Sequence, residues 1–161
     1  MFQAEKYNGT KEQGYGLVTK QLKALLEGES NQIANLSNAS ALLGQFLDRT
    51  NWVGFYLYEE ESSQLVLGPF QGLPACVRIP LGRGVCGTSA SEQKTLLIDD
   101  VHQFPGHIAC DAASQSEIVV PLVKEGKLLG VLDIDSPEKA RFDQEDQKYL
   151  ELFVEELLKH L

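Results

Sequence analysis

Helical periodicity is confined to the two ends of the chain, and this order of elements restricts the possible folds most. Near the N-terminus, two apolar stripes with a helical repeat predict two amphipathic helices, separated by Gly28 and Asn31. At the C-terminus, Asp143 is the expected N-cap of a third helix. The three apolar faces consist of Val18, Leu22, Leu25 and Leu26, then Leu36, Ala39, Leu43, Phe46 and Leu47, and finally Leu150, Phe153, Val154, Leu157, Leu158 and Leu161.

The middle of the chain reads as strands with one short helix. An aromatic and β-branched segment, 52–58, pairs with 64–67 across a polar turn, and a strand at 95–98 precedes a hairpin of 116–123 and 127–134. A short helix is expected at 85–91. Strands flanked by terminal helices predict an α+β fold in which an antiparallel sheet carries helices on one face.

Two segments of the middle region favour loops. Residues 68–87 hold five of the fourteen glycines and three of the six prolines, a density that breaks helices and interior strands. Residues 99–114 form a second predicted loop, which contains His102, His107 and Cys110. Because long loops within compact domains often carry function, we expect functional side chains in both segments.

Length and charge limit the class of protein. The 161 residues predict one domain over 1–161, with residues 1–14 expected to be poorly ordered. A net charge of −9 disfavours nucleic acid and anionic membranes as partners, since both attract clusters of Lys and Arg. The first residues lack the apolar stretch of a signal peptide, and no run approaches a membrane span, so we expect a cytoplasmic protein.

Three cysteines, Cys76, Cys86 and Cys110, lie in these loop-rich segments. Their wide spacing gives no CxxC pair, so neither a zinc ribbon nor a thioredoxin-type site follows from spacing. An odd count argues against a secreted, fully paired disulfide framework. The competing interpretations are a metal site, a redox centre and inert core packing, because free cysteine is often buried.

Each cysteine has a neighbour that favours ionisation. Cys86 follows Arg83 at the expected start of the short helix, whose first amides would lower the thiol pKa. Cys110 lies three residues after His107, and a charged imidazole would favour its thiolate. Cys76 precedes Arg78 in the glycine- and proline-rich loop. The thiols are therefore placed for chemistry as well as for packing.

Acidic residues occupy strand positions in the hairpin. Period-two alternation puts Asp133 and Asp135 on one face of their strand, although aspartate is depleted in strands. The turn decides whether Glu117 joins them. A three-residue loop ending at Gly126 would place Glu117 opposite Asp133, whereas a two-residue turn would send Glu117 to the other face. We favour the three-residue loop, because type I′ turns prefer Asn or Asp before Gly.

Three carboxylates on one patch have two interpretations. One is a solvated face of the sheet. The other is a cation site, since like charges at this spacing repel one another without a positive partner. A ligand ammonium group would supply that charge, and a divalent metal would also do so, although Ca²⁺ or Mg²⁺ usually takes its ligands from a dedicated loop or from phosphates.

Several longer segments combine these cysteine and acidic positions. They are NWVGFYL at 51–57, LVLGPFQG at 65–72, ACVRIPLGRGVCG at 75–87, GHIACDAASQSEIVVPL at 106–122 and GVLDIDSP at 130–137.

Together these segments resemble the GAF-fold free methionine-(R)-sulfoxide reductases, from about Tyr15 to the C-terminus. The resemblance implies a six-stranded antiparallel sheet with helices packed on one face, and a homodimer. It implies no metal and no organic cofactor. The substrate would be free methionine (R)-sulfoxide, and thioredoxin would be the reductant that recycles a disulfide.

The resemblance also implies roles for single residues. Cys110 would be the nucleophile, with Cys86 the other candidate, and Cys76 the first choice as resolving thiol. The substrate-binding positions are Glu117, Asp133 and Asp135, with Trp52 beside the methyl group. Read from its strand alone, Trp52 is more readily interpreted as a core residue.

Two other functions remain open at the level of sequence. A structural zinc site could use Cys76, Cys86, Cys110 and His107 as a Cys3His set, although the spacing is wide. A sensor without catalytic activity could bind a small amino-containing ligand at the acidic patch. Metal analysis separates zinc from redox chemistry, and turnover separates an enzyme from a sensor.

Overall fold

The computed structural model describes residues 2, 7, 9–107 and 111–161. Cys110 lies outside the described residues. The helices are α1 (Lys11–Leu26), α2 (Gln32–Phe46), α3 (Gly84–Glu92) and α4 (Gln144–Leu158), with a 3₁₀ turn at Val101–Gln103. The strands are β1 (Trp52–Glu59), β2 (Gln64–Gly72), β3 (Arg78–Pro80), β4 (Leu96–Ile98), β5 (Ser116–Lys124) and β6 (Lys127–Ser136).

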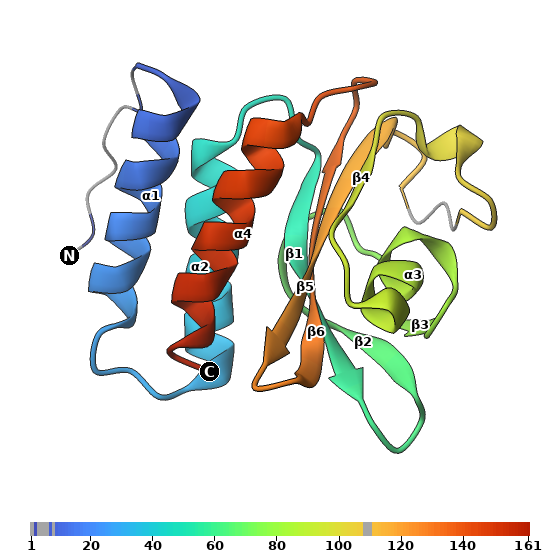
Figure 1. The fold of residues 1–161 in the computed structure, drawn as a ribbon, viewed down its shortest axis with the longest axis horizontal. Coiled ribbons are helices and arrows are strands. Elements are labelled where there is room, and N and C mark those ends of the chain that lie inside the picture. The colour runs from blue at the N-terminus through green and yellow to red at the C-terminus, as the bar shows by residue number, and fades with distance from the viewer. Residues whose placement is uncertain (1, 3–6, 8, 108–110) are drawn as a thin grey trace.

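All six strands form one antiparallel sheet in the order β3-β2-β1-β6-β5-β4, which confirms the expected α+β architecture. Figure 1 shows α2 and α4 against one face of this sheet, with α1 outside them and α3 on the opposite face. Leu36, Phe55, Leu132 and Phe153 are fully buried in the core between the sheet and the helices. The terminal helices therefore close one face, and the other face is left to α3 and loops.

The terminal helices begin where their caps predict. Asp143 accepts a hydrogen bond from the Asp146 amide and starts α4, as expected. Thr10 forms a capping box with Gln13 and starts α1 at Lys11. Residues 10–14, which we expected to be poorly ordered, are thus the cap and first turn of a helix.

The β5–β6 hairpin differs from the expected loop. Lys124 pairs with Lys127, so the turn has two residues, and both Glu125 and Gly126 have positive φ, as a type I′ turn requires. The register then shifts by one, because Leu129 is an extra residue opposite the Leu122–Val123 step. Without the bulge, the two-residue turn would place Glu117 on the face opposite to that of Asp133 and Asp135. The bulge shifts the pairing by one residue and places Glu117 on the same face as the two aspartates.

The glycine- and proline-rich segment contains more strand than expected. β2 continues through Gly68 and Pro69 to Gly72, and β3 follows within the same segment. The register of β1 against β2 shifts between Gly54 and Tyr56, opposite this point, so Pro69 lies at an irregularity where a missing N–H is tolerated.

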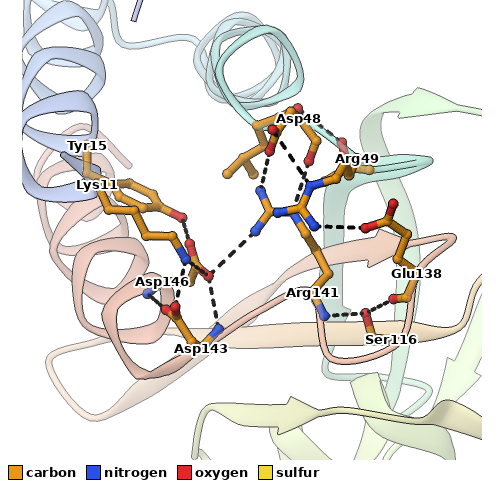
Figure 2. Close-up of polar contacts among 11 residues, drawn as sticks. Lys11, Tyr15, Asp48, Arg49, Ser116, Glu138, Arg141, Asp143 and Asp146 are labelled. Atoms are coloured by element: carbon orange, nitrogen blue, oxygen red, sulfur yellow. Dashed lines mark hydrogen bonds and ion pairs between the residues drawn. The ribbon is translucent and has the colours of Figure 1, made fainter. Parts of the chain in front are cut away.

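A buried polar network joins the helical layer to the end of the sheet (Figure 2). The side chain of Asp146 is 1% exposed; it accepts a hydrogen bond from Tyr15 Oη at 2.7 Å and an ion pair from Lys11 Nζ at 2.9 Å. The guanidinium of Arg141, 4% exposed, donates from Nη2 to Asp48 Oδ1 at 3.0 Å and lies 3.6 Å from Asp146. The charges of α1, α4 and the segment after α2 therefore neutralise one another.

The same network reaches the first residue of β5. Ser116 Oγ accepts a hydrogen bond from the Arg141 amide and donates one to the carbonyl of Glu138, as Figure 2 shows. Ser116 directly precedes Glu117, so these bonds fix the strand at the point where the carboxylates gather. None of the helices in the described part of the chain is long and apolar enough to cross a membrane.

Candidate active site

A pocket lies on the sheet face opposite α2 and α4. Its floor comes from the central strands β1, β5 and β6, and its walls come from α3, from residues 73–75 and from His107, Asp111 and Ser114. The predicted site residues Trp52, Cys86, Glu117, Asp133 and Asp135 all line it. Period-two alternation explains this gathering, because each of these strand residues points away from the helical core.

The three carboxylates meet at the floor of the pocket. Glu117 lies opposite Asp135 across β5 and β6, rather than opposite Asp133 as expected, and Asp133 lies opposite Gly54 of β1. Glu117 and Asp133 are each only 6% exposed. Among the described residues, Asp133 Oδ1 has no hydrogen-bond partner although it is buried. An unpartnered buried carboxylate oxygen that faces a pocket is suited to a ligand donor.

Burial and mutual repulsion make these acids weak. Burial raises the pKa of Glu117 and of Asp135 well above the ordinary carboxyl range, and the charge of Asp133 raises both further. Burial also raises the pKa of Asp133, which hydrogen bonds from Glu117 and Cys86 partly oppose. Glu117 and Asp135 therefore favour the protonated form, and a bound cation would favour their ionisation.

Gly54 keeps space beside the carboxylates. A Cβ at this position would lie 2.2 Å from Phe70 Cβ and 2.9 Å from the Trp52 ring. Phe70 stacks on Trp52 with ring centroids 5.1 Å apart. The glycine in the WVGFYL segment thus lets Phe70 of β2 stack on Trp52, whose ring lines the pocket.

Trp52 and Tyr56 hold the Cys76 loop in place. The indole Nε1 of Trp52 donates to the carbonyl of Leu73 at 3.1 Å, and Tyr56 Oη donates to the carbonyl of Cys76 at 2.9 Å. Trp52 is buried and also lines the pocket, so its position is compatible with both the core and the ligand interpretation of this residue. Tyr56 was not among the predicted site residues, although its spacing of four from Trp52 on a strand predicts the same face.

Cys86 lies in the first turn of α3, as expected, but its environment opposes ionisation. The thiol is buried and donates from Sγ to Glu117 Oε2 at 3.8 Å. Burial raises the pKa of this thiol well above its ordinary value, and the charges of Asp133 and Glu117 raise it further. The expectation that helix-start amides and Arg83 would lower this pKa is therefore wrong, because burial of the thiol and the nearby carboxylates outweigh them.

Cys76 is in a different state. It is disulfide-bonded, whereas Cys86 is a free thiol. Cys76 is half-buried in the loop that Tyr56 holds. A disulfide-bonded sulfur is not a zinc ligand, so a Cys3His site that needs the thiolate of Cys76 does not form in this state.

The loop before β5 brings further polar groups to the pocket. His107, Asp111 and Ser114 line it. Asn51 Nδ2 donates to Asp111 Oδ2 at 2.9 Å and to Ser114 Oγ at 3.1 Å, which ties the end of this loop to the start of β1. Burial lowers the pKa of His107, which favours neutral imidazole at neutral pH. No local sequence pattern predicted that Asn51 would hold this loop, because its partner Asp111 lies sixty residues away in the sequence.

One group of side chains in the described part of the chain could hold a metal ion. Single ligand atoms of Cys86, Glu117 and Asp133 lie within 4.8 Å of one another. These are the same acids that face the pocket, and an organic ammonium group would meet the same oxygens. The arrangement can thus neutralise a cation, supply a proton and enclose an apolar group beside Trp52.

Comparison with known proteins places these features in context. A model of the GAF domain matches residues 24–157. The chain is 63% identical over 161 residues to protein YtsP of Bacillus subtilis, covering 100% of this chain and 99% of that protein. It is 53% identical over 147 residues to the free methionine-R-sulfoxide reductase of Escherichia coli, covering 91% of this chain and 88% of that enzyme.

A solved structure is also closely similar. The free methionine-R-sulfoxide reductase from Neisseria meningitidis, in complex with its substrate, superposes with a TM-score of 0.92 at 42% sequence identity. The superposition covers 98% of this chain and 94% of that one. These similarities extend over the strands and loops that form the pocket.

Proposed function

Because the chain belongs to the GAF domain family, in the group that includes the free methionine-R-sulfoxide reductases, we propose that it reduces free L-methionine (R)-sulfoxide to L-methionine. The observation that carries the proposal is the cluster of buried Glu117 and Asp133 with half-buried Asp135 at the floor of a pocket with an apolar side. The (R) configuration of the substrate is inferred from the related enzymes, because it depends on which face of the sulfur meets the thiol.

The carboxylates select the free amino acid. The α-ammonium group of the substrate supplies the positive charge that the cluster lacks, and the unpartnered Asp133 Oδ1 is its first acceptor. A methionine sulfoxide within a peptide has no such ammonium and carries flanking chain on both sides. Charge and enclosure therefore exclude the peptide-bound residue. Trp52 packs against the S-methyl group on the apolar side.

A protonated carboxyl group activates the sulfoxide. Glu117 and Asp135 both have raised pKa values, so one of them holds a proton while the other acids bind the ammonium. That proton passes to the sulfoxide oxygen, which makes the sulfur electrophilic. No metal or organic cofactor enters this step.

The thiols carry the electrons. The thiolate of Cys110 attacks the activated sulfur and takes up the oxygen, which releases methionine and leaves Cys110 as a sulfenic acid. The thiol of Cys76 then attacks the sulfenic sulfur, water leaves, and a disulfide between the two cysteines forms. Two features support this division of labour: Cys76 is disulfide-bonded, and the environment of Cys86 keeps its thiol protonated. Cys86 acts as a supporting hydrogen-bond donor to Glu117.

The cycle closes outside the pocket. Thioredoxin reduces the disulfide by thiol exchange and returns both cysteines to the thiol state. A cytoplasmic location suits this cycle, because the cytosol keeps thioredoxin reduced. We also propose a homodimer as the working form.

A coupled assay tests the function. The protein is supplied with thioredoxin, thioredoxin reductase and NADPH, and is offered free methionine (R)-sulfoxide, the free (S) epimer, or a peptide that contains methionine sulfoxide. NADPH is expected to be consumed with the free (R) epimer alone, and Cys110→Ser is expected to abolish this consumption. Activity that survives in Cys110→Ser would assign the nucleophile to Cys86. Absence of turnover with every sulfoxide would favour a ligand-binding sensor.

A further inference from the structure

The loop around Cys76 presents apolar side chains to solvent. Leu73 is 64% exposed and Val77 is 62% exposed, and they lie on either side of the half-buried, disulfide-bonded Cys76. The other large exposed apolar side chains in the described part of the chain, Phe2, Ile33 and Leu152, lie far from this loop in sequence. Single apolar side chains scattered over a surface are common and need no explanation. Two that flank a disulfide indicate a contact surface.

The loop is held so that these side chains stay exposed. Three of its carbonyl groups accept hydrogen bonds from the sheet beneath: that of Leu73 from Trp52 Nε1, that of Cys76 from Tyr56 Oη, and that of Val77 from the amide of Leu67. The backbone is therefore anchored from below, and Leu73 and Val77 remain available above. A surface that is fixed before binding loses little conformational entropy when a partner docks.

The charge around the loop differs from that of the whole chain. Residues 62–91 contain no Asp or Glu and carry Arg83 and Arg78, the latter ion-paired with Glu59 at 3.0 Å, whereas the chain as a whole has a net charge of −9. Both arginines are exposed. An acidic partner can approach this side of the protein with less repulsion than it meets elsewhere, so the surface is complementary to an acidic protein.

We propose that Leu73 and Val77, with Arg78 and Arg83 beside them, form the docking surface for a protein dithiol reductant of the thioredoxin type, and that Cys76 Sγ is the sulfur it attacks. The inference rests on the proposed function, since it assigns the place where the catalytic disulfide is reduced. Two apolar side chains make a small contact, which suits a transient redox encounter because such complexes bury less than about 1,200 Å².

The electrons balance in two exchanges. A thiolate of the reductant attacks Cys76 Sγ, the bond from Cys76 to Cys110 breaks, and Cys110 leaves as a thiolate that takes up a proton. The second thiol of the reductant then loses its proton and attacks the reductant sulfur of the mixed disulfide. Cys76 leaves as a thiolate and is protonated. The reductant becomes a disulfide, and the enzyme gains two electrons and two protons.

Steady-state kinetics with two reductants tests the docking surface. Val77 lies outside the pocket lining, so Val77→Ser is expected to raise the KM for thioredoxin by about 5- to 10-fold, the effect of losing part of the burial of one Val side chain. The rate with dithiothreitol, which needs no docking surface, is expected to stay at the wild-type value. The matched control is Ile33→Ser, which removes an apolar side chain that is 68% exposed on α2 and should change neither rate.

Substitutions of opposite charge at the same position test the sign of the partner's charge. Val77→Glu and Val77→Lys both remove the apolar group, and the glutamate variant is expected to have the higher KM for an acidic thioredoxin. A thioredoxin KM that is unchanged in Val77→Ser and in Leu73→Ser would overturn the proposal. A parallel loss of the thioredoxin and dithiothreitol rates would do the same, since the effect would then lie in the chemistry.

Two further outcomes separate this inference from its alternatives. A shift in the oligomeric state of Val77→Ser in size-exclusion chromatography would assign the surface to a second copy of the chain and overturn the proposal. If the proposed function itself is wrong, the assay gives a different result, because the wild-type protein would then reduce no methionine sulfoxide even with dithiothreitol.

Discussion

Glu117 lies directly opposite Asp135 across the β5–β6 pair, and both side chains are turned to the pocket. Like charges in this position destabilise a sheet unless a proton or a cation intervenes. The raised pKa values of both groups favour a proton in this position. The same two groups that weaken the apo protein at high pH are therefore those that equip it to bind an ammonium group and to donate a proton.

This pairing predicts an alkaline limit to activity. The proposed proton donor is active only when protonated, so kcat should fall on the alkaline side of its raised pKa, by about tenfold for each pH unit at the limit. Glu117→Gln, which cannot transfer the proton, is expected to lower kcat by about 10²- to 10⁴-fold if Glu117 is the donor. The check is a pH profile of kcat for the wild type, Glu117→Gln and Asp135→Asn. A wild-type kcat that stays constant well into the alkaline range would rule out a carboxyl donor.

The same pairing predicts a pH-dependent stability. A carboxyl group whose pKa is raised in the folded state binds more protons folded than unfolded, so the free energy of unfolding falls as the pH rises from the unfolded pKa through the folded one. Glu117→Gln removes this loss. Its Tm relative to wild type should therefore be higher at pH 8 than at pH 5, by roughly 2–4 °C for each kcal/mol relieved. Thermal unfolding at both values gives the difference, and equal Tm shifts at the two would contradict it.

Cys86 should be unreactive in the folded protein. Burial and the adjacent carboxylates raise its thiol pKa, so iodoacetamide at neutral pH is expected to label reduced Cys76 before Cys86. Cys86→Ala should keep most of its turnover, because this thiol supports Glu117 and does not attack substrate. Mass spectrometry of the labelled, digested protein provides the measurement. Faster labelling of Cys86, with loss of turnover in Cys86→Ala, would return Cys86 to the role of nucleophile.

The network of Figure 2 predicts a large difference between two neighbouring aspartates. Asp146→Asn removes the buried charge that Lys11 and Arg141 face, and should cost about 3–5 kcal/mol of unfolding free energy. Asp143→Asn keeps an N-cap side chain at an exposed position and should cost less than about 1 kcal/mol. Urea unfolding of both variants checks the contrast, and similar midpoints would show that the network contributes little.

The sequence predicted the fold through patterns that are local. The helices, their caps and most strands follow from periodicity and capping residues, and the same alternation placed Trp52, Asp133 and Asp135 on one face. The hairpin turn was predicted wrongly, since propensity disfavours Glu125 at a positive φ, yet the bulge at Leu129 restored the face of Glu117. The prediction of a shared carboxylate patch was thus confirmed with a different register.

What the sequence did not predict depends on contacts between distant segments. The bonds from Asn51 to Asp111 and Ser114, and the ion pairs of Asp146 with Lys11 and Arg141, join residues whose local sequence carries no sign of the partner. The pKa of Cys86 was predicted in the wrong direction for the same reason. Helix position is visible in the sequence, whereas the carboxylates packed beneath the helix are visible only in the structure.

Recognition of the substrate ammonium by the buried carboxylates is tested most directly by comparing free methionine (R)-sulfoxide with its N-acetyl derivative on the wild-type protein. Acetylation removes the positive charge and leaves the sulfoxide unchanged. We expect kcat/KM to fall by about 30-fold or more, because loss of one partner of a buried charge pair costs about 2–5 kcal/mol. In Asp133→Asn the two substrates should differ far less. Equal kcat/KM for both substrates on the wild-type protein would contradict a carboxylate site for the free amino acid.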